Sequence, residues 1–144
     1  MFSFWTIARI VYSIAFALLH IYISQFVSSI EKRKNCPLKN TWKINNGKLL
    51  SSLLIIVAAI NVFVPASKFL STLPVIGSGY VFLFCLVLLV ELFIINRIAI
   101  NMNDDEYKGC RPKGYNMIID FFGNKTITDC MIYTSVLALI FFYL

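Results

Sequence analysis

Four stretches of this sequence are apolar over lengths that approach or match the thickness of a lipid bilayer. They cover residues 10–29, 49–64, 74–96 and 128–144. A helix rises about 1.5 Å per residue, so about 20 apolar residues cross the roughly 30 Å of hydrocarbon in a membrane. The second and fourth stretches are shorter than this, which local thinning of the bilayer accommodates. We therefore expect an all-α integral membrane protein whose four transmembrane helices form one compact bundle over residues 1–144.

The composition excludes both a water-soluble domain and a disordered chain. Hydrophobic residues make up 59% of the sequence and charged residues 14%, against roughly 45–50% and about 25% in soluble domains. The mean hydropathy of +0.78 is the reverse of the low hydrophobicity that disorder requires. Too little polar surface is available to enclose a core in water, so the chain needs lipid as its solvent.

The basic residues are concentrated between the apolar stretches. The formal net charge is +6, and eleven of the 13 Lys and Arg residues fall in segments 30–48 and 97–127. Four spans place both segments on one side of the membrane, and only Arg9 and Lys68 remain for the other side. Because basic loops stay on the cytosolic side, we expect both segments inside and the N- and C-termini on the opposite side.

The two basic segments are candidates for docking a partner. We expect them to face either the anionic headgroups of the lipid bilayer or an acidic protein of a neighbouring layer. Aromatic residues are too sparse there for a platform that stacks nucleic-acid bases, so we expect no specific nucleic acid. The candidate docking residues are Lys32, Arg33, Lys34, Lys39, Trp42 and Lys43 in the first segment and Lys108, Arg111 and Lys113 in the second.

Two ionisable residues, His20 and Glu91, lie inside apolar stretches. A charge near the centre of a membrane helix costs about 2.5–3.5 kcal/mol on insertion scales, so each needs a partner. Counted from the adjacent basic segments, the depths of the two residues in the membrane agree to about one helical turn. We therefore expect their side chains to meet. A protonated Glu91, a Glu91 that faces another protein and an ion or proton pathway are the alternatives. The amides of Gln25, Asn61 and Asn96 suit hydrogen bonds between helices.

Three of the four cysteines belong to the basic side. These are Cys36, Cys110 and Cys130, whereas Cys85 lies within the third apolar stretch. Two of the three can pair if the basic segments meet, and the sequence does not choose among them. A cytosolic face is normally reducing, so a disulfide there would imply a dedicated oxidation system or oxidation after assembly.

The chain carries no catalytic signature. We find no nucleophile–base pair with an orienting residue, no His-rich metal motif and no Gly-rich phosphate loop. We therefore expect no enzymatic activity, no cofactor, no metal and no small-molecule substrate. The expected function is that of a structural or assembly protein in a large membrane complex. A small ion- or proton-conducting protein and an accessory subunit of an organellar membrane complex are the alternatives.

A resemblance supports the structural class. Parts of the sequence resemble small multi-span membrane proteins of large double-stranded DNA viruses, over about a third of the chain. The resemblance implies a protein of the virion's internal membrane, beneath an icosahedral capsid, whose loops contact minor capsid proteins. It transfers no active-site residue. The matching stretches are Cys36-Pro37-Leu38, Thr41-Trp42-Lys43, Asn46-Gly47-Lys48, and residues 60–65, 67–70 and 73–78.

Overall fold

The protein is all-helical in the part of the chain that its structure, a computed structural model, describes. That part comprises residues 3–33, 36–37 and 41–144. The three longest helices are α1 (Phe4–Glu31), α2 (Trp42–Phe63) and α4 (Pro74–Met102). The expected all-α fold is confirmed. The shorter elements are α3 (Ala66–Thr72), the 3-10 helix η1 (Asp105–Cys110), α5 (Asn116–Gly123) and α6 (Ile127–Tyr143).

The helices have the lengths and compositions of membrane spans. α1, α2 and α4 are each long and apolar enough to cross a bilayer. α5 and α6 meet that standard only together, as a pair bent by 110°. The structure therefore offers three spans, or four where the bent pair is counted as one, and the chain is a multi-pass integral membrane protein by these criteria.

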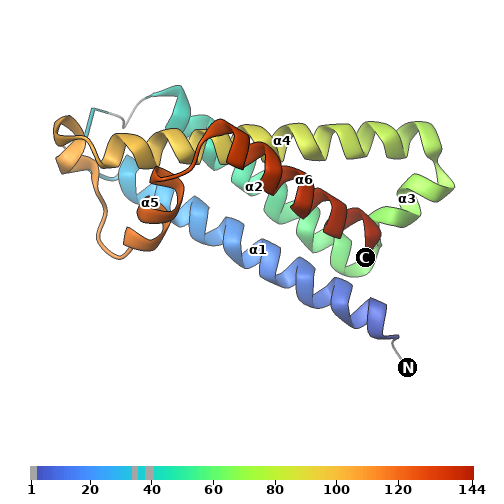
Figure 1. The fold of residues 1–144 in the computed structure, drawn as a ribbon. Helices are drawn as coiled ribbons and strands as arrows, with labels where there is room; N and C mark the ends of the chain where they lie inside the picture. Colours follow the sequence, from blue (N-terminus) through green and yellow to red (C-terminus); the bar gives the residue numbers. More distant parts are fainter. Residues whose placement is uncertain (1–2, 34–35, 38–40) are drawn as a thin grey trace.

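The chain connections gather at two opposite ends of the bundle (Figure 1). The N-terminus, α3 and the C-terminus lie at one end, which we call the terminal end. The connection from α1 to α2, η1 and α5 lie at the other, which we call the basic end because it carries the two basic segments. The termini and the basic segments are thus separated by the length of the bundle.

The helices at the basic end extend beyond the apolar stretches of the sequence. α2 begins at Trp42, so Lys43 and Lys48 are helical, and α4 continues past Asn96 to Met102. The basic segments 30–48 and 97–127 are therefore partly helical, because hydropathy marks where lipid contact ends and not where backbone hydrogen bonding ends. The positions at which these helices leave the lipid stay a prediction.

The interior packs tightly, but the outside of the bundle is equally apolar. Between α1, α2 and α4, a Cβ built on Gly47 would lie 3.5 Å from Ile94 Cγ2 and 3.6 Å from Val27 Cγ2, so these helices approach closely. On the outer surface Phe63 is 82% exposed and Val75 is 86% exposed. Apolar side chains cover much of the outside in this way, which water would penalise and lipid tolerates.

Candidate functional site

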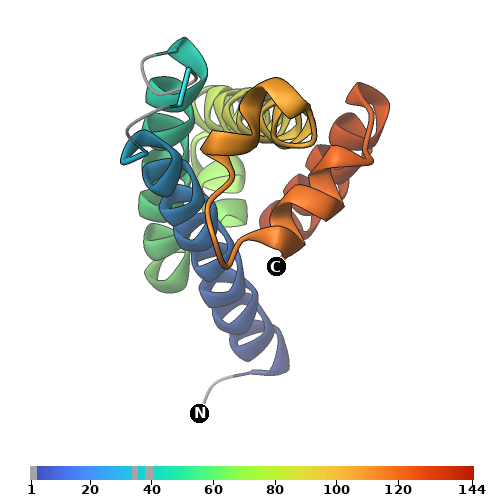
Figure 2. The ribbon, with the colours of Figure 1, turned by 90° about the vertical axis from the view of Figure 1, so that its left-hand side faces the viewer.

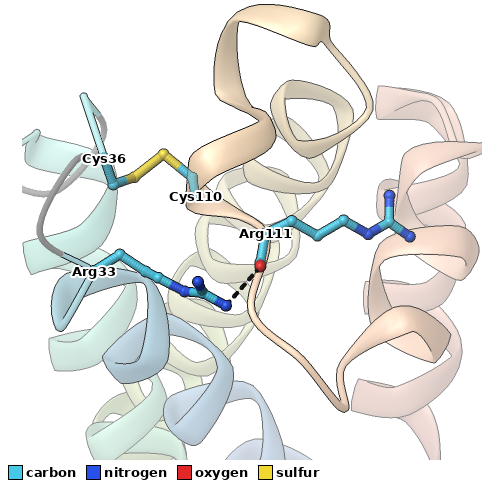
Figure 3. The surroundings of a disulfide bond; sticks show 4 residues. All are labelled: Arg33, Cys36, Cys110 and Arg111. Carbon is cyan, nitrogen blue, oxygen red and sulfur yellow. Dashed lines mark hydrogen bonds between the residues drawn. A yellow bond between two sulfur atoms is a disulfide. The ribbon is translucent and has the colours of Figure 1, made fainter.

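A disulfide between Cys36 and Cys110 joins the two basic segments (Figure 3). These cysteines are 74 residues apart in the sequence. They meet because the connection after α1 and the 3-10 helix after α4 lie at the same end of the bundle. Cys130 is a buried free thiol, and Cys85 is also free. The sequence leaves the pairing among Cys36, Cys110 and Cys130 open. The structure has the pairing that links the two basic segments covalently.

Two arginines that are candidate docking residues form hydrogen bonds within the basic end. Arg33 Nη2 donates to the carbonyl oxygen of Arg111 at 2.9 Å, next to the disulfide (Figure 3). The guanidinium of Arg111 donates to Asn116 Oδ1 at 3.1 and 3.2 Å and to Asn103 Oδ1 at 3.4 Å. Its Nη2 also lies 3.8 Å from Asp120 Oδ1. Both side chains are engaged within the molecule, which a count of charges along the sequence does not reveal.

The other cations of the basic end differ in whether they are paired. Lys48 Nζ lies 2.6 Å from Glu31 Oε2 and links α2 to the end of α1. Lys32, Lys43 and Lys113 form no ion pair with any residue that the structure describes. Trp42, the first residue of α2 and the neighbour of Lys43 in the sequence, is 56% exposed. We call Lys32, Trp42, Lys43 and Lys113 the docking surface. Of the remaining candidates, Lys34, Lys39 and the side chain of Lys108 lie outside the described residues.

The structure brings His20 and Glu91 together in the interior of the bundle. His20 Nδ1 lies 2.8 Å from Glu91 Oε2, and both side chains are fully buried. His20 stands 11 residues before Glu31, the last residue of α1, and Glu91 stands 11 residues before Met102, the last residue of α4. The two therefore share a depth in the bundle. The contact has the distance of an ion pair without the alignment of a hydrogen bond.

The buried pair has apolar surroundings. On the terminal side, the His20 ring packs on Phe16, with 4.3 Å between ring centroids. Phe16 in turn contacts Phe84 and Phe141, each at 5.9 Å. His20 Nε2 and Glu91 Oε1 have no hydrogen-bond partner among the described residues. The pair is thus bordered by an aromatic cluster toward the terminal end.

Asn96 satisfies the backbone at the bend between α5 and α6. Its Nδ2 donates to the carbonyl oxygen of Phe122 at 2.6 Å and to that of Lys125 at 2.8 Å. Asn96 is 1% exposed. Where a helix breaks in apolar surroundings, backbone groups without partners are costly, and one side chain supplies two hydrogen bonds here. The sequence suggests a hydrogen bond between helices for Asn96, and this side chain of α4 forms it with the bend between α5 and α6.

The other two amides behave differently. Asn61 Nδ2 donates to Ser13 Oγ at 2.7 Å, and its Oδ1 accepts from the backbone N–H of Ala66 at 2.9 Å. Asn61 thus joins α1 and α2 to the start of α3 near the terminal end. The expectation for Gln25 is wrong, because it lies on the exposed side of α1 and its side chain forms no hydrogen bond within the described chain.

Replacing Asn96 by leucine should destabilise the protein. The change keeps the size of the side chain but leaves the carbonyl of Lys125 without its donor and that of Phe122 with only the backbone N–H of Lys125 at 3.3 Å, which we expect to cost about 1–3 kcal/mol. The measurement is the free energy of unfolding in detergent micelles. The matched control is Asn46→Leu at an exposed position of α2, which should change it by less than about 0.5 kcal/mol. Equal stability of the two variants would contradict the role assigned to Asn96.

No family model matches the chain, and neither a curated protein nor a solved structure shows significant similarity to it. The geometry of the basic end and of the buried pair is therefore the basis on which a function is proposed.

Proposed function

We propose that this protein is a non-catalytic structural component of a large membrane assembly. Its apolar helices anchor it in the bilayer, and the docking surface at its basic end binds an acidic face of a neighbouring protein layer. The observation that carries this proposal is the Cys36–Cys110 disulfide, which joins both basic segments into one unit. A covalently fixed surface loses less conformational freedom on binding than two separate loops would.

The charges of the docking surface support an electrostatic contact. Lys32, Lys43 and Lys113 form no ion pair within the described structure, so their charges are available to a partner. A positive patch steers an acidic partner and fixes its orientation. Exposed Trp42 adds an aromatic group of the kind that often contributes most to binding at interfaces.

The partner that we propose is a capsid-layer protein of a virion. The resemblance to small membrane proteins of large double-stranded DNA viruses supports this choice. The disulfide supports it as well, since an oxidised basic end on the cytosolic side requires a dedicated oxidation system or oxidation after assembly. We propose that the basic end faces the capsid layer and that both termini lie on the opposite side of the internal membrane.

Crosslinking in the native assembly tests this proposal. Gentle purification followed by lysine crosslinking should join Lys32, Lys43 and Lys113 to an acidic neighbour. The double variant K32E/K43E should lose most of the crosslinking through Lys113, which it retains, and its incorporation into the assembly. The control K68E reverses a charge at the terminal end, where Lys68 is exposed, and should keep both. A lone monomer without neighbours, or equal losses in the two variants, would contradict the proposal.

A second candidate function, conduction of protons or ions, is favoured by the buried His20–Glu91 pair. Ionisable residues inside a membrane often mark such pathways. The aromatic cluster of Phe16, Phe84 and Phe141 argues against it, because these apolar rings pack next to the pair on its terminal side. A flux across liposomes that Glu91→Gln abolishes would favour conduction over the structural function.

A further inference from the structure

An open groove lies between α1, α4, α5 and α6. Its volume is about 540 Å³. It exists because α6 packs mainly on α4 and touches α1 only slightly. Figure 2 shows α1 and α6 separated, with the chain that leads into α5 passing between them at the basic end. Leu19 and Tyr22 of α1 line the groove on one side, Phe121 of α5 lines its end, and Tyr133 and Val136 of α6 line the other side.

The exposed lining of the groove is entirely apolar. The hydroxyl of Tyr22 is turned away to donate to the carbonyl of Gly114 at 3.3 Å. The groove therefore offers nothing to a polar ligand and suits a hydrocarbon chain. Its volume falls in the range of about 300–1,000 Å³ that proteins use for small molecules. An empty hollow of this kind would lose its dispersion contacts, and acyl chains are the apolar molecules at hand in a bilayer.

A cation stands at the basic end of this groove. Lys125 Nζ lies 5.0 Å from the centroid of the Phe121 ring, which lines the groove. Asn96 fixes the backbone there through the carbonyl of Lys125. On the side of α1, Lys113 is exposed and precedes Gly114, whose carbonyl is bonded to Tyr22. Positive charge therefore flanks the apolar groove at the end where lipid headgroups would lie.

Asp129 lies close enough to interact electrostatically with Lys125, but the nearby described carboxylates make their short contacts with other groups. Asp129 Oδ2 accepts from the backbone N–H of Thr126 at 2.9 Å and from its hydroxyl at 3.1 Å, which caps α6. Asp120 Oδ1 lies 3.8 Å from Arg111 Nη2. Lys125 forms no ion pair with any described residue. Its ammonium group is thus able to form an ion pair with an anionic group outside the chain.

We propose that the groove binds one anionic phospholipid of the surrounding bilayer. One acyl chain lies in the groove between α1 and α6, and the phosphate pairs with Lys125. Basic pockets between membrane helices are known to select anionic headgroups. The bound lipid would complete the contact between α1 and α6 that the protein itself leaves open.

Native mass spectrometry of the whole protein tests the proposal. The protein is reconstituted with equal amounts of phosphatidylglycerol and phosphatidylcholine and released into detergent. We expect one retained phosphatidylglycerol per chain. Lys125→Gln should reduce its preference over phosphatidylcholine about fivefold, the effect of removing one lysine near a headgroup. Val136→Trp fills the groove and should abolish retention of both lipids.

Leu139→Trp is the control for the groove. Leu139 is 57% exposed on the same helix but does not line the groove, so this variant should retain the lipid as the parent protein does. Equal retention of the two lipids by the parent protein would overturn the proposal, as would unchanged retention in Val136→Trp. A dimer that crosslinks through the groove would also overturn it. Lys125→Gln alters only a partly exposed side chain and keeps the test decisive if Val136→Trp does not fold.

Discussion

Replacing His20 by leucine is expected to lower the free energy of unfolding by about 3–5 kcal/mol, because it leaves Glu91 buried without its partner. Both side chains are fully buried and lie 2.8 Å apart at Nδ1 and Oε2. The double variant His20→Leu/Glu91→Leu should recover most of this loss, since well-packed apolar residues often replace a buried ion pair at little cost. Unfolding of the two single variants and the double variant in detergent micelles gives the coupling energy directly.

The control for this cycle is Gln25→Leu, on the exposed side of the same helix. It should change the free energy of unfolding by less than about 0.5 kcal/mol. Equal effects of His20→Leu and Gln25→Leu would show that the contact between His20 and Glu91 contributes nothing. A double variant as unstable as His20→Leu would show that the loss arises from packing around the ring and not from an unpaired carboxyl group.

Removal of the disulfide is expected to have the second-largest effect. Cys36→Ser should lower the free energy of unfolding by about 2–4 kcal/mol, because the bond closes a long loop and restricts the unfolded chain. The cysteines are 74 residues apart, for which loop-closure entropy alone suggests a value near the top of this range. Helices that persist in the membrane after unfolding already restrict the chain, which moves the expected value downward.

Unfolding with and without reductant measures this effect. The parent protein should lose stability on reduction, and Cys36→Ser should not respond. The control is Cys85→Ala, which removes a free cysteine of α4 and should keep the response to reductant. Maleimide labelling of the denatured, unreduced protein should modify two of the four cysteines. Labelling of all four would show that the bond does not form.

The positions of the buried polar residues follow from the sequence more readily than the ends of the helices do. His20 and Glu91 can be matched because helical rise converts sequence distance into depth, and an unpaired charge in lipid is costly enough to require a neighbour. No comparable cost marks the place where a helix ends outside the lipid. α4 therefore runs to Met102, although its apolar stretch stops near Asn96.

The arrangement of the basic end could not be derived from composition. A count of Lys and Arg locates the charged segments but does not distinguish Lys32, which is exposed, from Arg33, which donates to the carbonyl of Arg111. The bend between α5 and α6 is equally hidden, because Asn96 bonds to carbonyls 26 and 29 residues away. Such contacts depend on how the helices cross, which a single sequence does not specify.

The disulfide has a consequence for the biogenesis of the protein. Between Cys36 and Cys110 the chain passes through α2 and α4, the two helices that carry it away from the basic end and back. If either helix failed to insert, the two thiols would be left on opposite faces of the membrane and could not be oxidised to one bond. The oxidised form thus excludes molecules in which only one of the two helices crossed the membrane, and a non-reducing gel would separate those molecules from correctly threaded ones.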